Sequence, residues 1–337
     1  MILVFTNSRF LSDFIPEFPE HLQLVIMSAT TGYSYDKLPQ KLLLRIVNPL
    51  PLEQRIQLRL VSSHWLDTIE SDLAKETSLT VRMIGSKRTA ENGEVRDEVG
   101  KVRAPDDDNS LVVDTSRNPY NFSKLSSILE LLPGIRELTV EVSGRRDAFL
   151  VQRLLCHYED QLKSLVLYNF TREQLAKIFC LYDTSLPRLT NLQIYPNAQS
   201  VSSTGFSKFK MLPEKPSLQK IKHFTYIDHG GSKSEENQLA DLFMENLTSK
   251  CKALTLLARD CPWRFPTLTA SVKHITLLDG NYRHILGLCQ KFHLLKSVEF
   301  HAHGRIVSFS NPSLCYTEFL LILSSFYSCL TKTSSRN

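Results

Sequence analysis

Two histidines, His301 and His303, have the residue type and spacing of a pair of metal ligands. They lie in a predicted strand, where alternate side chains project from the same face, and imidazole is a common zinc ligand. No third ligand with zinc-type spacing accompanies them, so surface histidines are the favoured interpretation. None of the strings GxxxxGK(S/T), GxGxxG, HExxH or GxSxG occurs, and 12 glycines leave little material for phosphate-binding loops. We therefore predict no catalytic residue, no metal site and no cofactor, and expect a chain that is not an enzyme.

Composition indicates which classes of partner the chain is expected to bind and in which cellular compartment it is expected to lie. Lys and Arg number 40 against 35 Asp and Glu, an excess too small to predict nucleic-acid binding. Seven Cys without a CxxC pair indicate free thiols and a cytoplasmic and/or nuclear protein, in which the sequons at Asn121, Asn169 and Asn246 would carry no glycan. The apolar run 319–330 is shorter than the roughly 20 residues that a membrane-spanning helix needs, so no membrane partner is expected.

The stretch YDKLPQKLLLRIVNPLPLEQRIQLRLVSSHW, residues 35–65, predicts a small helical cluster. Its apolar residues recur every three or four positions, which is the helical period. Pro49 and Pro51 cannot lie inside a helix without losing a hydrogen bond and clashing with the preceding turn. They are therefore expected to separate the first helix from the second.

From about residue 119 onward, amphipathic stretches alternate with short strand-like runs. Seven runs fit the pattern L-x-x-L-x-L with other apolar residues allowed, and the whole set resembles degenerate leucine-rich repeats, which bury their apolar faces by stacking. Only Asn197 occupies the Asn/Cys position of that repeat, so the usual Asn ladder is missing. A doubly wound α/β sheet, which also alternates helix and strand, remains the alternative. The seven matches are Ile135/Leu138/Val140, Leu162/Leu165/Leu167, Leu189/Leu192/Ile194, Ile221/Phe224/Tyr226, Cys251/Leu254/Leu256, Val272/Ile275/Leu277 and Leu295/Val298/Phe300.

The helical cluster resembles the F-box, the short module by which substrate receptors dock onto the Skp-type adaptor of cullin-RING ubiquitin ligases. The resemblance covers roughly residues 36–73 and needs no insertion. Lys41 stands where the F-box usually has Glu, and Arg55 where it usually has Leu, with Ile56 as a substitute for the lost apolar contact. The matching positions are Leu38-Pro39, Leu42, Ile46, Leu50, Val61-Ser62 and Trp65.

The two resemblances together imply the substrate-recognition subunit of a Skp-cullin-F-box ubiquitin ligase. A three-helix unit of this size cannot bury all of its Leu and Ile side chains, so several should remain for a partner. Three other interpretations stay open: a helical cap on the first repeat, a leucine-rich-repeat scaffold that binds a partner without any ligase, and, more remotely, an α/β enzyme. The adaptor-binding residues that the resemblance implies are Leu38, Pro39, Leu42, Ile46, Leu50, Ile56, Val61 and Trp65.

The predicted fold class is α/β, with a three-helix F-box-like module followed by a right-handed leucine-rich-repeat solenoid that has parallel strands on its concave side and helices outside. The expected segments are a disordered or artefactual extension (1–26), the F-box-like module (34–75), a strand, a charged loop and a first edge strand (76–118), the repeats (119–304) and a C-terminal cap or tail (305–337).

Strand alternation also predicts where an unknown protein substrate binds. If the pattern leucines face the core, their neighbours along each strand face the concave side. Val166, Tyr168, Tyr195, Ile227 and Leu278 would then form an exposed strip, with Tyr168 and Tyr195 as anchors, because aromatic side chains are enriched among residues that dominate binding. The alternative is that the tail or the loop 197–217 covers the strip.

Overall fold

The structure is a computed structural model, and it describes residues 38–84, 109–115, 122–142, 147–171, 174–175, 177–181, 186–197, 218–227, 243–257, 266–278, 291–302 and 305–310. The predicted extension 1–26, most of the charged loop and residues 311–337 lie outside these ranges. The chain divides into two compact units. The first contains residues 1–76, 107–110 and 127–134, and the second contains residues 77–106, 111–126 and 135–337.

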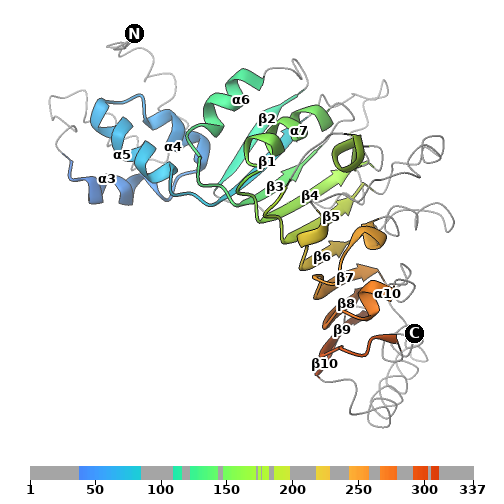
Figure 1. Cartoon of the computed structure of the whole chain (residues 1–337). Coiled ribbons are helices and arrows are strands. Elements are labelled where there is room, and N and C mark those ends of the chain that lie inside the picture. Colours follow the sequence, from blue (N-terminus) through green and yellow to red (C-terminus); the bar gives the residue numbers. More distant parts are fainter. Residues whose placement is uncertain are drawn as a thin grey trace, which may run out of the picture. The chain divides into compact units, whose positions relative to one another are not determined.

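The described part of the first unit contains the helices α3 (Gln40–Val47), α4 (Leu52–Leu58) and α5 (Ser63–Leu73) (Figure 1). Prolines separate α3 from α4 as predicted, and Pro51 is the N-cap of α4. Ser62 has an extended backbone and caps α5, since its side chain accepts a hydrogen bond from the backbone N–H of Trp65. The buried apolar residues of this unit are Leu43, Val47, Leu50, Leu52, Leu58, Trp65, Ile69 and Leu73, together with Leu129 and Leu132.

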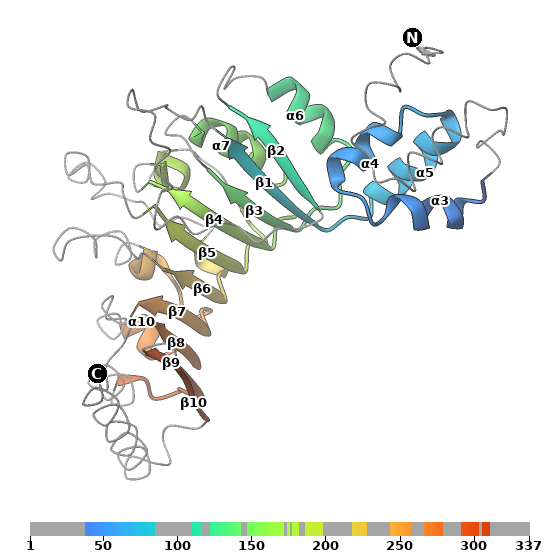
Figure 2. The ribbon, with the colours of Figure 1, turned by 180° about the vertical axis from the view of Figure 1, so that it is seen from behind.

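Ten strands of the described residues form one sheet, in the order β10-β9-β8-β7-β6-β5-β4-β3-β1-β2, and Figure 2 shows them side by side in a single row. The strands are β1 (Ser78–Ile84), β2 (Ser110–Asp114), β3 (Glu137–Glu141), β4 (Ser164–Phe170), β5 (Asn191–Pro196), β6 (His223–Tyr226), β7 (Ala253–Leu257), β8 (His274–Leu278), β9 (Ser297–Ala302) and β10 (Arg305–Ser310). Between them lie α6 (Phe122–Leu129), α7 (Ala148–His157), the π-helix η3 (Lys177–Leu181), the 3-10 helix η5 (Leu218–Lys220) and α10 (Pro266–Thr269).

The seven sequence matches coincide with the seven successive strands β3 to β9, and these strands pair in parallel. The middle residue of each match is aligned with the middle residue of the next, as in Leu138↔Leu165↔Leu192. These residues are buried, which identifies one face of the sheet as a core face. The prediction of an α/β chain with a helical N-terminal region followed by parallel strands is therefore confirmed.

The last strand breaks the parallel pattern. β10 pairs antiparallel with β9, and Ala302 is the partner of Arg305, so only two residues separate the strands. Parallel neighbours require a long crossover, whereas antiparallel strands can be joined by such a short connection. The sequence pattern ended at Gly304, and it did not predict this strand.

Candidate protein-binding surfaces

The helical unit presents part of its predicted adaptor-binding set on its surface. Leu42 is 46 % exposed and Pro39 is also exposed. Four further members are half-buried and retain some accessible surface: Leu38, Ile46, Ile56 and Val61.

The structure places the other two members, Leu50 and Trp65, in the core, where they are 4 % and 2 % exposed. The backbone N–H of Leu50 donates to the carbonyl oxygen of Val47, which turns the chain inward after α3. Trp65 lies one helical turn before the fully buried Ile69, so both face the interior of the unit. Both residues can support a binding surface only by packing beneath it.

Leu60 was missed as a surface residue, although it is the most exposed large apolar side chain of the described region, at 75 %. It follows the end of α4, and its backbone N–H donates to the carbonyl oxygen of Gln57. Leu60 follows Ile56 by four positions, which is one of the helical spacings found in residues 35–65. The helix ends at Leu58, so that periodicity does not reach Leu60.

Leu38 is held against α5 by a polar contact that the sequence did not reveal. The Nε2 atom of His64 lies 2.9 Å from the carbonyl oxygen of Leu38, within hydrogen-bonding distance. The contact fixes the backbone immediately before α3. His64 therefore positions the Leu-Pro pair at the start of the module.

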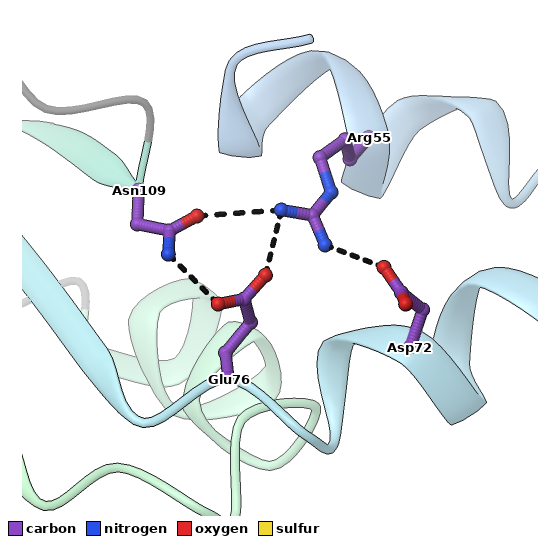
Figure 3. Close-up of polar contacts among 4 residues, drawn as sticks. All are labelled: Arg55, Asp72, Glu76 and Asn109. Carbon is purple, nitrogen blue, oxygen red and sulfur yellow. Dashed lines mark hydrogen bonds and ion pairs between the residues drawn. The ribbon is translucent and has the colours of Figure 1, made fainter. Parts of the chain in front are cut away.

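Arg55, at the position where an F-box usually has Leu, is buried in a polar network (Figure 3). Its Nη2 lies 2.9 Å from Asp72 Oδ2 and its Nη1 lies 2.8 Å from Glu76 Oε1. Nη1 also donates to Asn109 Oδ1, and Asn109 Nδ2 donates to Glu76 Oε2. One guanidinium thus joins α4, the end of α5 and residue 109 within the helical unit.

The face of the sheet opposite the buried leucines is largely polar. Its central row consists of half-buried side chains aligned strand to strand: Thr139, Val166, Gln193, Thr225, Thr255, Thr276 and Glu299. Side chains on adjacent strands form hydrogen bonds across this face. Asn191 bonds to Ser164, and His274 bonds to Ser297. These hydrogen bonds pair polar groups within the face. The central row is half-buried, and Glu299 is its one charged residue.

Tyr168 and Tyr195 are aligned on β4 and β5 and stack with ring centroids 4.6 Å apart and planes within 7°. Stacking removes most of Tyr168 from solvent, and it is 9 % exposed, while Tyr195 is half-buried. Burial, reinforced by Tyr195 and Glu141, raises the pKa of Tyr168 to about 12. Burial also raises the pKa of Tyr195.

These shifts predict alkaline sensitivity. Because the folded pKa of Tyr168 lies above the ordinary value of about 10, its contribution to stability is complete below pH 10 and is lost as the pH rises to about 12. We expect the free energy of unfolding, measured by urea titration, to fall across this interval. Tyr168→Phe, which cannot ionise, should show a shallower fall, and identical slopes for the two proteins would contradict the assignment.

The exposed strip predicted from alternation is only partly accessible. Tyr168 and Ile227 are buried, the latter at 8 % exposure, whereas Val166, Tyr195 and Leu278 are half-buried. Alternation along a strand identifies the face to which a side chain belongs. It does not show how much of that side chain a neighbouring strand covers, which explains the difference for Tyr168.

The residues considered for metal binding or modification have structural contacts where they are described. His301 contacts the Glu299 carboxylate, and His303 lies outside the described residues. No group of three potential ligands occurs in the part of the chain that the structure describes. Asn169 is 3 % exposed, and its amide donates to Glu141, so this sequon is inaccessible.

Cys156 and Cys251 are free thiols, and burial raises the pKa of Cys251 to about 12. Among the described residues, every helix is too short or too polar to cross a bilayer.

Comparison with known proteins supports one of the two resemblances. Residues 36–76 match the F-box domain family, over the stretch that forms α3, α4 and α5. F-box domains generally bind Skp-type adaptors. A search of curated proteins found no match to the chain.

Proposed function

We propose that the chain is the substrate-recognition subunit of a Skp-cullin-F-box ubiquitin ligase and has no catalytic role of its own. The observation that carries this proposal is the F-box match over residues 36–76, together with an exposed Leu42 in α3. Apolar side chains on so small a unit gain roughly 1.5–3 kcal/mol each when a partner covers them. The adaptor-facing surface in this proposal consists of Leu38, Pro39, Leu42, Ile46, Ile56 and Val61.

The sheet is proposed to be a stack of leucine-rich-repeat type that binds the target protein. The order of its strands follows the chain from β3 to β10 without a reversal, whereas a doubly wound sheet reverses its strand order at a switch point. Val166, Tyr195 and Leu278 on the polar face retain some exposure and remain candidate target contacts.

The adaptor-binding role is tested by the double variant Leu38→Ala, Pro39→Ala. Loss of the two side chains from the start of the module should weaken co-purification of a Skp-type adaptor, and of cullin with it, at least about tenfold. The measurement is the amount of adaptor recovered with the tagged full-length chain after co-expression.

The matched control is Leu294→Ala, which truncates a 51 % exposed leucine of the sheet unit and should leave adaptor recovery unchanged. Undiminished recovery with the double variant would remove the adaptor-binding assignment. Recovery of adaptor without cullin would leave the F-box assignment intact and contradict the ligase role.

A further inference from the structure

A row of lysines follows one end of the parallel strands. The residues directly before β6, β7, β8 and β9 are Lys222, Lys252, Lys273 and Lys296, which we call the lysine row. Their backbones form a continuous ladder, in which the N–H of each later lysine donates to the carbonyl oxygen of the preceding one at 2.7–2.8 Å. At the strand spacing of about 4.8 Å, the row extends over about 14 Å.

The described segments that lead directly into β5 to β9 carry only basic charges. The segments that lead into β5 to β9, residues 186–191, 218–223, 247–253, 269–274 and 291–297, contain no Asp or Glu. Their charged residues are Arg188, Lys220, Lys222, Lys250, Lys252, Lys273, Lys291 and Lys296. The segment before β4 differs, because Glu159 and Asp160 accompany Lys163 there. Positive charge is therefore concentrated in the segments that lead into β5 to β9, although the whole chain carries a net charge of only +5.

Like charges on adjacent strands repel and destabilise the sheet. Lys222 and Lys296 are exposed and Lys273 is half-buried, and none of the three forms an ion pair with a described residue. Lys252 donates from Nζ to the carbonyl oxygen of Ser249 at 2.6 Å, a contact that leaves its charge unneutralised. An anionic partner would relieve this repulsion.

We propose that the lysine row binds an acidic segment of a protein partner, in which Asp or Glu side chains project from an extended chain. About four or five extended residues span about 14 Å. Lysine offers a compact point charge and lacks the planar fork with which arginine binds phosphate through two bonds. The five basic segments contain no exposed Phe, Tyr or Trp on which bases could stack, since Phe292 is buried. Leu294 is their one exposed large apolar residue, too little for insertion into a lipid surface.

Identification of this partner as a ligase target rests on the proposed function, whereas the binding chemistry does not. The experiment is fluorescence anisotropy of the full-length chain with a labelled peptide of about eight residues rich in Glu, and with the same peptide carrying Gln in place of Glu. The variant Lys222→Gln, Lys273→Gln, Lys296→Gln removes three charges from the row and leaves Lys252, which bonds to the backbone. Its matched control is Arg45→Gln, Lys75→Gln, Arg153→Gln, which removes three exposed charges outside the segments that lead into β4 to β9.

We expect the row variant to bind the Glu-rich peptide about tenfold more weakly, since each exposed charge pair contributes a factor of about two to five. The control variant should bind it as the parent does, and raised salt should weaken parent binding. Equal affinity for the Glu and Gln peptides, or equal loss in both variants, would overturn the proposal. Tighter binding of a single-stranded oligonucleotide or of vesicles with anionic lipid would also overturn it, in favour of those partners.

Adaptor recovery measured on the same proteins separates this proposal from the proposed function. The row variant should recover the Skp-type adaptor as the parent does. A parent chain that binds the peptide but no adaptor would end the ligase proposal and leave the lysine row as an acidic-segment site. A parent chain that recovers the adaptor but does not bind the peptide would overturn the lysine-row proposal and leave the ligase proposal standing.

Discussion

Arg55→Ala is expected to lower the free energy of unfolding of the helical unit by about 3 kcal/mol. The Arg55 side chain is 4 % exposed, and its two carboxylate partners, Asp72 and Glu76, are 17 % and 22 % exposed. Removal of one partner from a buried ion pair leaves charges that water reaches poorly, which typically costs 3–5 kcal/mol. Because both carboxylates are partly exposed, we expect a cost near the lower end of this range of 3–5 kcal/mol. Asn109 would also lose the guanidinium as a hydrogen-bond donor.

The measurement is urea denaturation of the full-length chain, followed by Trp65 fluorescence in a Trp263→Phe background, because Trp65 is buried in the helical unit. Arg59→Ala serves as the control. Its partner Glu70 lies 3.2 Å away and is 40 % exposed, so its loss should cost less than about 1 kcal/mol. Equal effects of the two substitutions would contradict a special role for Arg55.

A second variant separates the charge network from the volume of the side chain. Arg55→Leu restores the residue usual for an F-box but leaves Asp72 and Glu76 without their cation, so it should remain destabilised. Additional replacement by Asp72→Asn and Glu76→Gln should recover part of the loss, since a neutral amide without a cation costs less to bury than a carboxylate without one. Failure of the triple variant to exceed Arg55→Leu in stability would show that the carboxylates are not the source of the cost.

The Arg55 network also shows where sequence reasoning ends. The sequence identified Arg55 as a departure from the F-box pattern. Asp72 lies in the last turn of α5 and Glu76 lies four positions later, just after the helix, so their closeness follows from local spacing. Asn109 is 54 positions from Arg55. No local period relates the two, because their contact depends on how the chain returns after β1. Ile56, expected to replace the lost apolar contact, is half-buried, and Arg55 itself occupies the interior.

The strands were predictable because their signal is local and repeated. Leu165 and Leu167 alternate along one strand, and the same alternation recurs in the neighbouring runs, which aligns the strands and identifies their buried face. Burial of Tyr168 was not predictable in the same way, because it depends on the ring of Tyr195 on the next strand. The lysine row was present in the sequence, one position after the first apolar residue of four successive matches, and could have been found by aligning polar as well as apolar positions.

Leu42→Asp is expected to weaken binding of a Skp-type adaptor about 100-fold while the chain stays folded. Leu42 is 46 % exposed, so the substitution removes no core residue, in contrast to its fully buried neighbour Leu43. Burial of a leucine contributes roughly 1.5–3 kcal/mol, and a carboxylate buried without a partner adds a desolvation cost, whereas about 1.4 kcal/mol already corresponds to tenfold in affinity.

Leu42→Met, which keeps the apolar volume, should bind like the parent, and Leu294→Asp should show that a surface charge elsewhere has no effect. Affinity would be measured by titration of purified adaptor, and the urea midpoint would establish folding. Parent-like affinity for Leu42→Asp would exclude α3 as the docking surface, and a lowered midpoint would place Leu42 in the core.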